Sequence, residues 1–156
     1  MSAIIYEANL LIERIKQKYP LFTGRTVSKE ELIILQDKLK IKLPTWYIDL
    51  HTQVPIIDAE FGFKEYEPDA NYDGISFIIW SDINGVIEES LQFSPGIEVF
   101  EQGYIHVASC STGSGDPIFI KLQDEKDPSV YRIYHDDISV MEVSSKLSEF
   151  FKTAII

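Results

Sequence analysis

The sequence has very little cysteine: Cys110 is the single one among 156 residues. One thiol excludes a disulfide framework within the chain and a zinc site built from cysteines alone. The sequence also lacks any apolar run close to the roughly 20 residues that a membrane-spanning helix needs. Its first residues have no basic start and include Glu7 and Glu13, so they do not form a signal peptide. We therefore expect a soluble, cytoplasmic protein that does not enter a membrane.

Basic residues are scarce in the middle of the chain. The net charge is -11, from 14 Lys and Arg against 25 Asp and Glu. Residues 58–101 hold 11 acidic side chains and one basic side chain, Lys64, whereas residues 1–57 hold 8 basic and 6 acidic ones. A negative field of this kind repels phosphate backbones and attracts cationic surfaces. The charge pattern therefore disfavours direct nucleic-acid binding and favours a basic protein partner.

The remaining composition is typical of a globular protein. Hydrophobic residues make up 45% of the chain and charged residues 25%. A chain of this length can bury a core of its own, and no linker, repeat or low-complexity tract divides it. We therefore expect a single domain over residues 1–156.

The first third of the chain predicts helices. Apolar residues between positions 4 and 19 recur at spacings of three and four, which is the period of one helix face. Ser28 followed by Glu31 has the form of a capping box and predicts the start of a second helix. Pro44 fits the first turn of a third, short helix over residues 45–53, because proline has no N–H to leave unpaired there.

The rest of the chain predicts mainly strands and turns. Residues 61–66 and 75–80 have the composition of strands, and residues 83–91 predict a helix that Ser81 or Asp82 would cap. Residues 104–109, 118–122 and 130–134 predict three further strands, joined by turn-rich segments, with a helix directly after them. The predicted fold class is α+β, with N-terminal helices, a largely antiparallel or mixed sheet of about five to six strands, and a C-terminal helix.

Several short motifs between Val27 and Phe151 also resemble those of a known family. They are Leu43-Pro44 with Tyr47, Gly113-Ser114-Gly115-Asp116, Phe119, Leu122, Val130-Tyr131, His135-Asp136, and Ser144 with Leu147, Phe150 and Phe151. In this order and spacing they resemble the SUKH superfamily, the Smi/Knr-type domain of bacterial toxin-immunity proteins and of fungal cell-wall regulators. The resemblance implies an α+β fold and a protein-binding function. Residues 51–55 depart from the family pattern, in which an Asn-Gly turn often follows the Leu-Pro-x-x-Tyr motif.

Two groupings of residues have a catalytic interpretation. His106 and Cys110 suggest a Cys-His pair, but four positions along a strand separate them by about 13 Å, on the same even-numbered side. A structural, partly buried Cys110 is favoured. Ser114 lacks the flanking glycines of a hydrolase elbow, and no Gly-Lys-Ser/Thr follows as in a phosphate loop. A turn is favoured, in which Asp116 accepts N–H groups of the same turn. We predict no enzymatic activity and no catalytic residue.

Metal and cofactor sites are also disfavoured by spacing. His51, His106 and His135 form no His-x-x-x-His or Glu-x-x-His pair. The acidic residues around Asp124 and Asp127 lack the glycine and closing glutamate of a calcium loop. We therefore predict no bound metal and no cofactor.

The acidic middle segment has two interpretations. It is either a solvated surface or a binding surface, and interleaved aromatic residues favour binding because aromatic side chains anchor interfaces. These aromatic residues are Phe61, Phe63, Tyr66, Tyr72, Phe93 and Phe100. The balanced charge of residues 1–57 also argues that solubility does not require the acidic excess. The predicted partner-binding residues are Glu65, Glu67, Asp69, Tyr72, Asp73, Glu98 and Glu101.

The resemblance and the charge pattern together predict an immunity protein. It would bind and neutralise a cognate toxin of a polymorphic or contact-dependent system by stoichiometric occlusion through its acidic face. The partner would be a basic protein toxin domain, for example a nuclease whose own groove is basic. The alternative is an intracellular regulatory or scaffold module that binds proteins, as the fungal branch of the resemblance implies.

Overall fold

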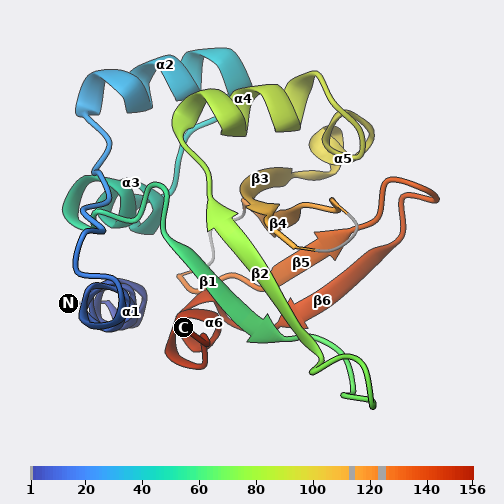
Figure 1. Cartoon of the computed structure of the whole chain (residues 1–156). Coiled ribbons are helices and arrows are strands. Elements are labelled where there is room, and N and C mark those ends of the chain that lie inside the picture. Colours follow the sequence, from blue (N-terminus) through green and yellow to red (C-terminus); the bar gives the residue numbers. More distant parts are fainter. Residues whose placement is uncertain (1, 113–114, 123–125) are drawn as a thin grey trace.

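The computed structural model describes residues 2–112, 115–122 and 126–156 (Figure 1). The helical elements are α1 (Ala3–Lys18), α2 (Lys29–Leu39), α3 (Thr45–Gln53), α4 (Ile83–Leu91), α5 (Gly96–Val99), the 3-10 turn η1 (Phe100–Gln102) and α6 (Leu147–Lys152). The strands are β1 (Glu60–Lys64), β2 (Ile75–Trp80), β3 (Tyr104–Cys110), β4 (Ile118–Lys121), β5 (Val130–Ile133) and β6 (Val140–Ser144). Residues 113, 114 and 123–125, which include part of the glycine motif and Asp124, lie outside the described residues.

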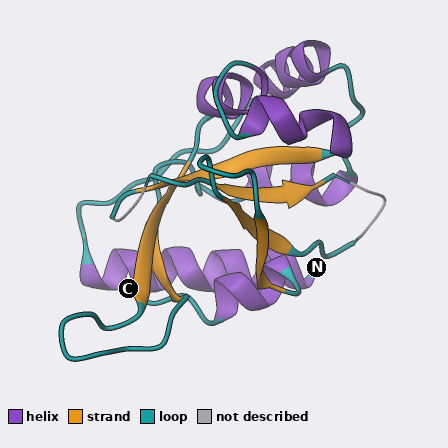
Figure 2. Ribbon diagram, turned by 90° about the vertical axis from the view of Figure 1, so that its right-hand side faces the viewer, coloured by secondary structure: helices purple, strands orange, loops and turns teal. Residues whose placement is uncertain are grey.

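The six strands form one sheet in the order of the chain, and each strand is antiparallel to its neighbours. The pairing of β3 with β4 shifts between His106 and Ala108, and that of β5 with β6 shifts between Val130 and Tyr131. Such bulges bend a strand and increase its twist. Figure 2 shows the resulting curled sheet between two groups of helices. The predicted α+β class and the antiparallel sheet of up to six strands are therefore confirmed.

The last strand was missing from the sequence prediction. A helix was expected directly after residues 130–134, but a turn and β6 come before α6. Val140 and Met141, two large apolar residues that begin β6, are both exposed, so the strand has no alternating apolar pattern. A second difference concerns residues 96–102, which form α5 and η1 before β3 begins.

The helix starts follow from local hydrogen bonds. The hydroxyl of Ser28 accepts from the Glu31 N–H at 3.1 Å, and the Glu31 carboxylate accepts from the Ser28 N–H at 3.2 Å. This reciprocal capping box is the one predicted from the sequence. At α4 the Asp82 carboxylate accepts from the Gly85 N–H at 2.8 Å. Pro44 precedes α3 with φ -67° and ψ 154°, the extended conformation of a residue just before a helix.

The main core is formed by α1, α2, α3, α4 and α6 together with one face of the sheet. The rings of Trp80 and Phe151 lie 5.4 Å apart, and those of Phe61 and Phe150 lie 5.7 Å apart. Phe61 and Phe63 are 0% and 4% exposed, which corrects their prediction as interface aromatics. They point inward because β1 packs this face on α6. A smaller cluster, formed around Val99, Phe119 and Ile133, lies on the opposite face.

Two histidines, His51 and His106, are buried in the half of the molecule that α2, α3 and α4 cover, which we call the helix-covered half. The Nε2 atom of His51 accepts from the Trp80 indole N–H at 3.1 Å, so Nδ1 carries the proton and donates to the Tyr47 carbonyl at 2.8 Å. Burial lowers the pKa of His51 to about 4. His106 contacts the Ser81 hydroxyl at 2.7 Å, and burial lowers its pKa to about 3. Both rings are therefore neutral at physiological pH.

Candidate protein-binding surface

The loop between β1 and β2 carries five of the seven predicted contact residues. Its two ends are joined where the N–H groups of Glu65 and Tyr66 donate to the Gly74 carbonyl, at 2.9 and 3.1 Å. Gly74 has φ +80°, and a side chain there would place its Cβ 2.2 Å from the Tyr66 carbonyl oxygen. Only glycine fits this closing turn. The loop therefore has a defined base from which its acidic residues project.

The acidic side chains of this loop are exposed and partly ordered by the backbone. Asp69 accepts from the Asn71 N–H at 2.8 Å, and Asp73 accepts from the Ile75 N–H at 3.0 Å. These are the local contacts expected of aspartates in turns. Glu67, Asp69, Tyr72 and Asp73 are all exposed, and the ring of Tyr72 lies 6.3 Å from that of Tyr66.

Glu65 does not share this surface. Its side chain is 2% exposed, and its Oε2 accepts from the Nε of Arg132 at 2.5 Å. Such a side chain cannot form a surface contact, which corrects its placement in the predicted set. The sequence pattern missed this because Arg132 lies 67 positions away and is itself buried.

Glu98 and Glu101 lie on a different element but are linked to the loop through the turn between β5 and β6. Both are exposed, on α5 and η1. On one side of the turn, the Tyr134 hydroxyl bonds the Tyr66 hydroxyl at 2.8 Å. On its other side, Ile138 packs in the cluster that contains Val99 of α5. The turn therefore lies between the two predicted acidic groups.

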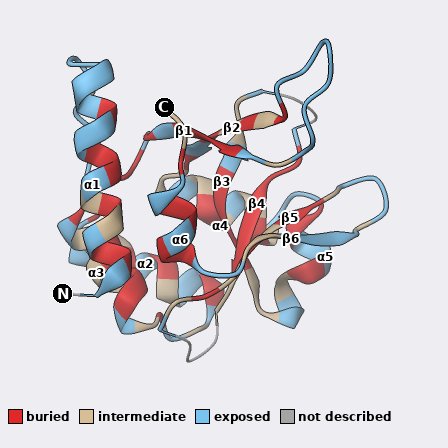
Figure 3. Cartoon of the chain, turned by 90° about the horizontal axis from the view of Figure 1, so that it is seen from below, coloured by how far each residue is buried: buried red, intermediate tan, exposed pale blue. Residues whose placement is uncertain are grey.

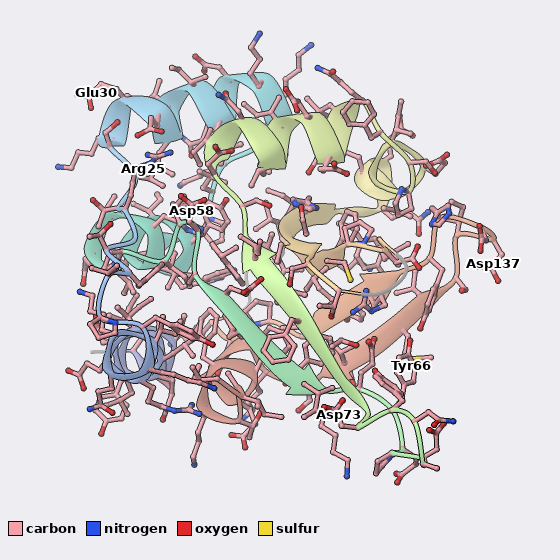
Figure 4. The ribbon with its side chains drawn as sticks, viewed as in Figure 1. Arg25, Glu30, Asp58, Tyr66, Asp73 and Asp137 are labelled. Carbon is pink, nitrogen blue, oxygen red and sulfur yellow. The ribbon has the colours of Figure 1, made fainter. Side chains whose placement is uncertain are left out.

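The turn adds acidic residues that the sequence prediction did not select. The side chain of Asp136 is 87% exposed, and Asp137 in the turn and Glu142 in the following strand, β6, are also exposed. Figure 4 shows Asp73, Tyr66 and Asp137 along one side of the molecule, with Arg25, Glu30 and Asp58 on the opposite side. Figure 3 shows the β1–β2 loop and the β5–β6 turn as largely exposed segments. The sequence signal for this turn is the His135-Asp136 motif, which fits a turn or surface segment but was not included in the predicted contact set.

We call this surface the acidic edge. It consists of Glu67, Asp69, Asp73, Glu98, Glu101, Asp136, Asp137 and Glu142, with Tyr66 and Tyr72 beside them.

A buried polar network lies behind the acidic edge. Glu65 accepts from the Ser76 hydroxyl at 2.6 Å as well as from Arg132. The Nη1 of Arg132 donates to the Asp116 carbonyl at 2.5 Å, and the Asp116 carboxylate accepts from the His135 N–H at 2.9 Å. The network therefore connects the base of the β1–β2 loop to the β5–β6 turn.

His135 closes the network at the surface. Its Nδ1 lies 2.6 Å from the Asp116 carboxylate and its Nε2 lies 3.1 Å from that of Asp136. The hydrogen bond to Asp116 and the charge of Asp136 raise the pKa of His135. Asp116 was predicted to serve only its own turn. Its contact with His135, 19 positions away, shows that it also holds a distant turn.

Two pockets accompany these surfaces. A pocket of about 270 Å³ beside the network is lined by Tyr66, Tyr72, Cys110 and Arg132 among others, and is smaller than the roughly 300–1,000 Å³ of typical ligand sites. A pocket of about 560 Å³ lies between the end of α2 and η1. Its lining residues are mainly apolar and include three lysines and Glu101.

The structure orients His106 and Cys110 differently from the sequence expectation. The register shift in β3 pairs His106 with Phe119 and Ala108 with Ile118, which are on opposite faces of β4. His106 and Cys110 therefore point to opposite faces of the sheet, which corrects the expectation that they share one. The thiol of Cys110 contacts the Thr112 carbonyl.

Within the described ranges, no group of three or more His, Cys, Asp or Glu side chains is arranged to hold a metal ion. In the same part of the chain, no helix has the length and apolar character to cross a membrane.

Comparison with known protein families gives a match over most of the chain. The model of the SMI1 / KNR4 family (SUKH-1) matches residues 26–153, from just before α2 to the end of α6. Neither the curated proteins nor the solved structures contain a match to this chain.

Proposed function

The chain belongs to the SMI1 / KNR4 family (SUKH-1), and from this premise we propose that it is an immunity protein. It binds a cognate toxin of a polymorphic or contact-dependent system in the cytoplasm and neutralises it by one-to-one occlusion. The family includes toxin-immunity proteins, and the alternative within it is a regulatory or scaffold module. We also propose one domain, because α1, outside the family match, packs on α3 and α6 in the same core.

The acidic edge is the observation that supports this proposal. Its eight carboxylates come from segments far apart in the sequence, and all of them are exposed. A negatively charged surface attracts a basic protein and can raise its association rate from about 10⁵–10⁶ to about 10⁸–10⁹ M⁻¹s⁻¹ at low salt. Fast association suits a protein that must bind a toxin before the toxin acts.

The buried polar network supports the same proposal by fixing the edge before binding. Arg132 and Asp116 hold the β5–β6 turn, while Glu65 and Gly74 hold the base of the β1–β2 loop. A preformed surface loses less conformational entropy on association than a loose one. Tyr66 and Tyr72 supply aromatic anchors among the acids. We propose binding, not catalysis, as the mechanism.

The test is affinity capture with tagged full-length protein from lysate of the source organism, at about 50 mM and about 500 mM salt, which shortens the Debye length about threefold. The edge variant is Glu67→Gln/Asp69→Asn/Asp73→Asn, whose amides keep the local acceptor oxygens. The control is Glu13→Gln/Asp37→Asn/Asp58→Asn, which removes the same charge from exposed positions on other elements. Asp58 has φ +71°, a conformation that asparagine also adopts readily.

We expect wild type and control to recover one basic toxin domain at low salt and the edge variant to recover at least about tenfold less, a change of about 1.4 kcal/mol. The recovered protein is then titrated against wild type for one-to-one binding and loss of toxic activity. Equal recovery by the edge and control variants would contradict the acidic edge as the docking surface. Several unrelated regulatory partners would instead favour the scaffold alternative.

A further inference from the structure

The two edges of the sheet end differently. The outer side of β1 is paired: the Gly62 N–H donates to the Ile155 carbonyl at 2.7 Å, and the Ile155 N–H donates to the Gly62 carbonyl at 2.8 Å. Arg14 holds the neighbouring Ala154 carbonyl at 2.6 Å. At the other end of the sheet, β6 pairs with β5 and with no further strand among the described residues.

The outward backbone groups of β6 follow from its register. The Tyr134 N–H donates to the Ser139 carbonyl at 3.0 Å, which makes these two residues a hydrogen-bonded pair. Ile133 then pairs with Val140, Arg132 with Met141, and Tyr131 with Glu142. Hydrogen-bonded and non-bonded pairs alternate along an antiparallel ladder, so Met141 bonds β5. The N–H and C=O groups of Val140 and Glu142 point away from the sheet.

The first half of this edge has little protection against another strand. Natural edges are blocked by lysine, proline, inward charges, a cover or a β-bulge, and the bulge of β6 comes only after Glu142. Residues 140–144 contain no lysine or proline, and Val140 and Met141 are 40% and 45% exposed. The first half of β6 therefore offers unpaired backbone groups beside exposed apolar side chains.

The charge around β6 selects the kind of strand that fits. Asp136 and Asp137 precede the strand and Glu142 lies within it, all exposed. A second copy of β6 would bring like charges together, which disfavours self-pairing. An extended segment with lysine or arginine at alternate positions would place cations beside these carboxylates.

We propose that β6 is a strand-addition site, which binds an extended segment of the toxin in which basic and apolar residues alternate. This inference rests on the proposed function and adds the binding mode. Backbone hydrogen bonds to Val140 and Glu142 extend the sheet by one strand. Basic side chains of the segment contact Asp136, Asp137 and Glu142, and apolar ones, on the opposite face of the sheet, contact Met141.

The first test uses synthetic peptides and the ¹⁵N-labelled full chain. The probes are Lys-Val-Arg-Val-Lys-Val, the same peptide with every amide N-methylated, and Glu-Val-Glu-Val-Glu-Val. At about 1 mM and low salt, the basic peptide should shift the amides of Val140 and Glu142 and slow their hydrogen exchange at least about tenfold. The N-methylated and acidic peptides should not. Unchanged amides with the basic peptide, or equal protection by the N-methylated one, would overturn the inference.

The second test compares Val140→Pro with Val140→Thr. Proline removes the outward N–H, a change that edge strands tolerate, whereas threonine keeps it. We expect Val140→Pro to lose the peptide-induced protection at Glu142 and Val140→Thr to retain it. If a captured toxin binds both variants equally, the proposed function stands and strand addition fails. If the basic peptide protects β6 but capture recovers no toxin, strand addition stands and the proposed function fails.

Discussion

Two regions of the molecule treat buried polar groups in opposite ways. In the half covered by α2, α3 and α4, His51 and His106 are buried as neutral rings because burial lowers their pKa values to about 4 and about 3. Behind the acidic edge, Glu65 and Arg132 are each 2% exposed and form an ion pair at 2.5 Å. The first region removes charge from its interior, and the second retains it by pairing.

The two regions therefore differ in role: the buried histidines stabilise the core, whereas the ion pair positions the acidic loops. A neutral histidine hydrogen-bonded to Trp80 stabilises the core without affecting the surface charge. The ion pair instead continues through Asp116 to His135 and so to the turn that carries Asp136. Buried ion pairs add little net stability, since desolvation offsets the attraction between the charges. Their value here is geometric, because they hold two acidic loops in fixed relation.

The largest expected effect is the loss of stability in acid that the buried histidines of the helix-covered half should cause. Between the ordinary histidine pKa near 6.5 and the lowered values, the unfolded chain binds protons that the native chain does not. The free energy of unfolding should therefore fall as pH falls, by about 1.4 kcal/mol per pH unit for each histidine. Urea unfolding from pH 7 to pH 4.5 measures this slope. A His51→Gln variant should show a shallower slope, and an unchanged slope would contradict the assignment.

Removal of Arg132 alone should destabilise the region behind the acidic edge. Arg132→Met leaves Glu65 buried without its cation and should lower the free energy of unfolding by about 3–5 kcal/mol. The double variant Glu65→Met/Arg132→Met removes both charges and should recover most of this loss. Denaturant unfolding of the singles and the double completes the cycle. A double variant as unstable as Arg132→Met would mean that the pair has a larger role in stability than its geometry implies.

Removal of the α2 helix cap should lower stability without changing the affinity for a partner. Ser28→Ala deletes the hydroxyl that accepts from Glu31 and should lower the free energy of unfolding by about 1 kcal/mol. Because Ser28 caps the end of α2 opposite the one that lines a pocket with Glu101, affinity for a captured partner should not change once the protein is folded. Urea unfolding and partner titration measure the two effects, and a coupled loss of affinity would show that the regions are not independent.

The smallest effect should have the opposite pH dependence. The Asp116 carboxylate raises the pKa of His135 in the native state, so the stability from this contact is full below about pH 6.5 and is lost as pH rises through the raised pKa. Because His135 is exposed at the surface, the effect on unfolding should be slight. NMR titration of the ring should give a pKa above 6.5 in wild type and a lower one in Asp116→Asn. Equal values in the two proteins would rule out this contact.

Local signals were sufficient for most of the fold. The capping box at Ser28, the Pro44 helix start and the apolar strand before Trp80 each depend on residues close in sequence, and the structure contains all three elements. β6 escaped prediction because its exposed residues carry no apolar period. The opposite orientations of His106 and Cys110 depend on a register shift that no composition reveals.

The candidate surface was only partly predictable, for the same reason. Asp69 and Asp73 share a loop and could be grouped by sequence, whereas Asp136 joins them through a contact between Tyr66 and Tyr134. Glu65 looked like its acidic neighbours until the fold placed Arg132 against it. Long-range partners, not residue types, decided which acids reach the surface.

The placement of the acidic edge on turns, short helical segments and one outer strand also bears on how the sequence of such a protein can evolve. Glu67, Asp136 and Glu142 are exposed and lie outside the packed core. Exposed substitutions of this kind usually change stability by less than about 0.5 kcal/mol. Single substitutions on the acidic edge can therefore change which partner the surface fits while the fold is preserved. If the surface of a binding partner changes, substitutions on the acidic edge can restore the fit without any change in the packed core.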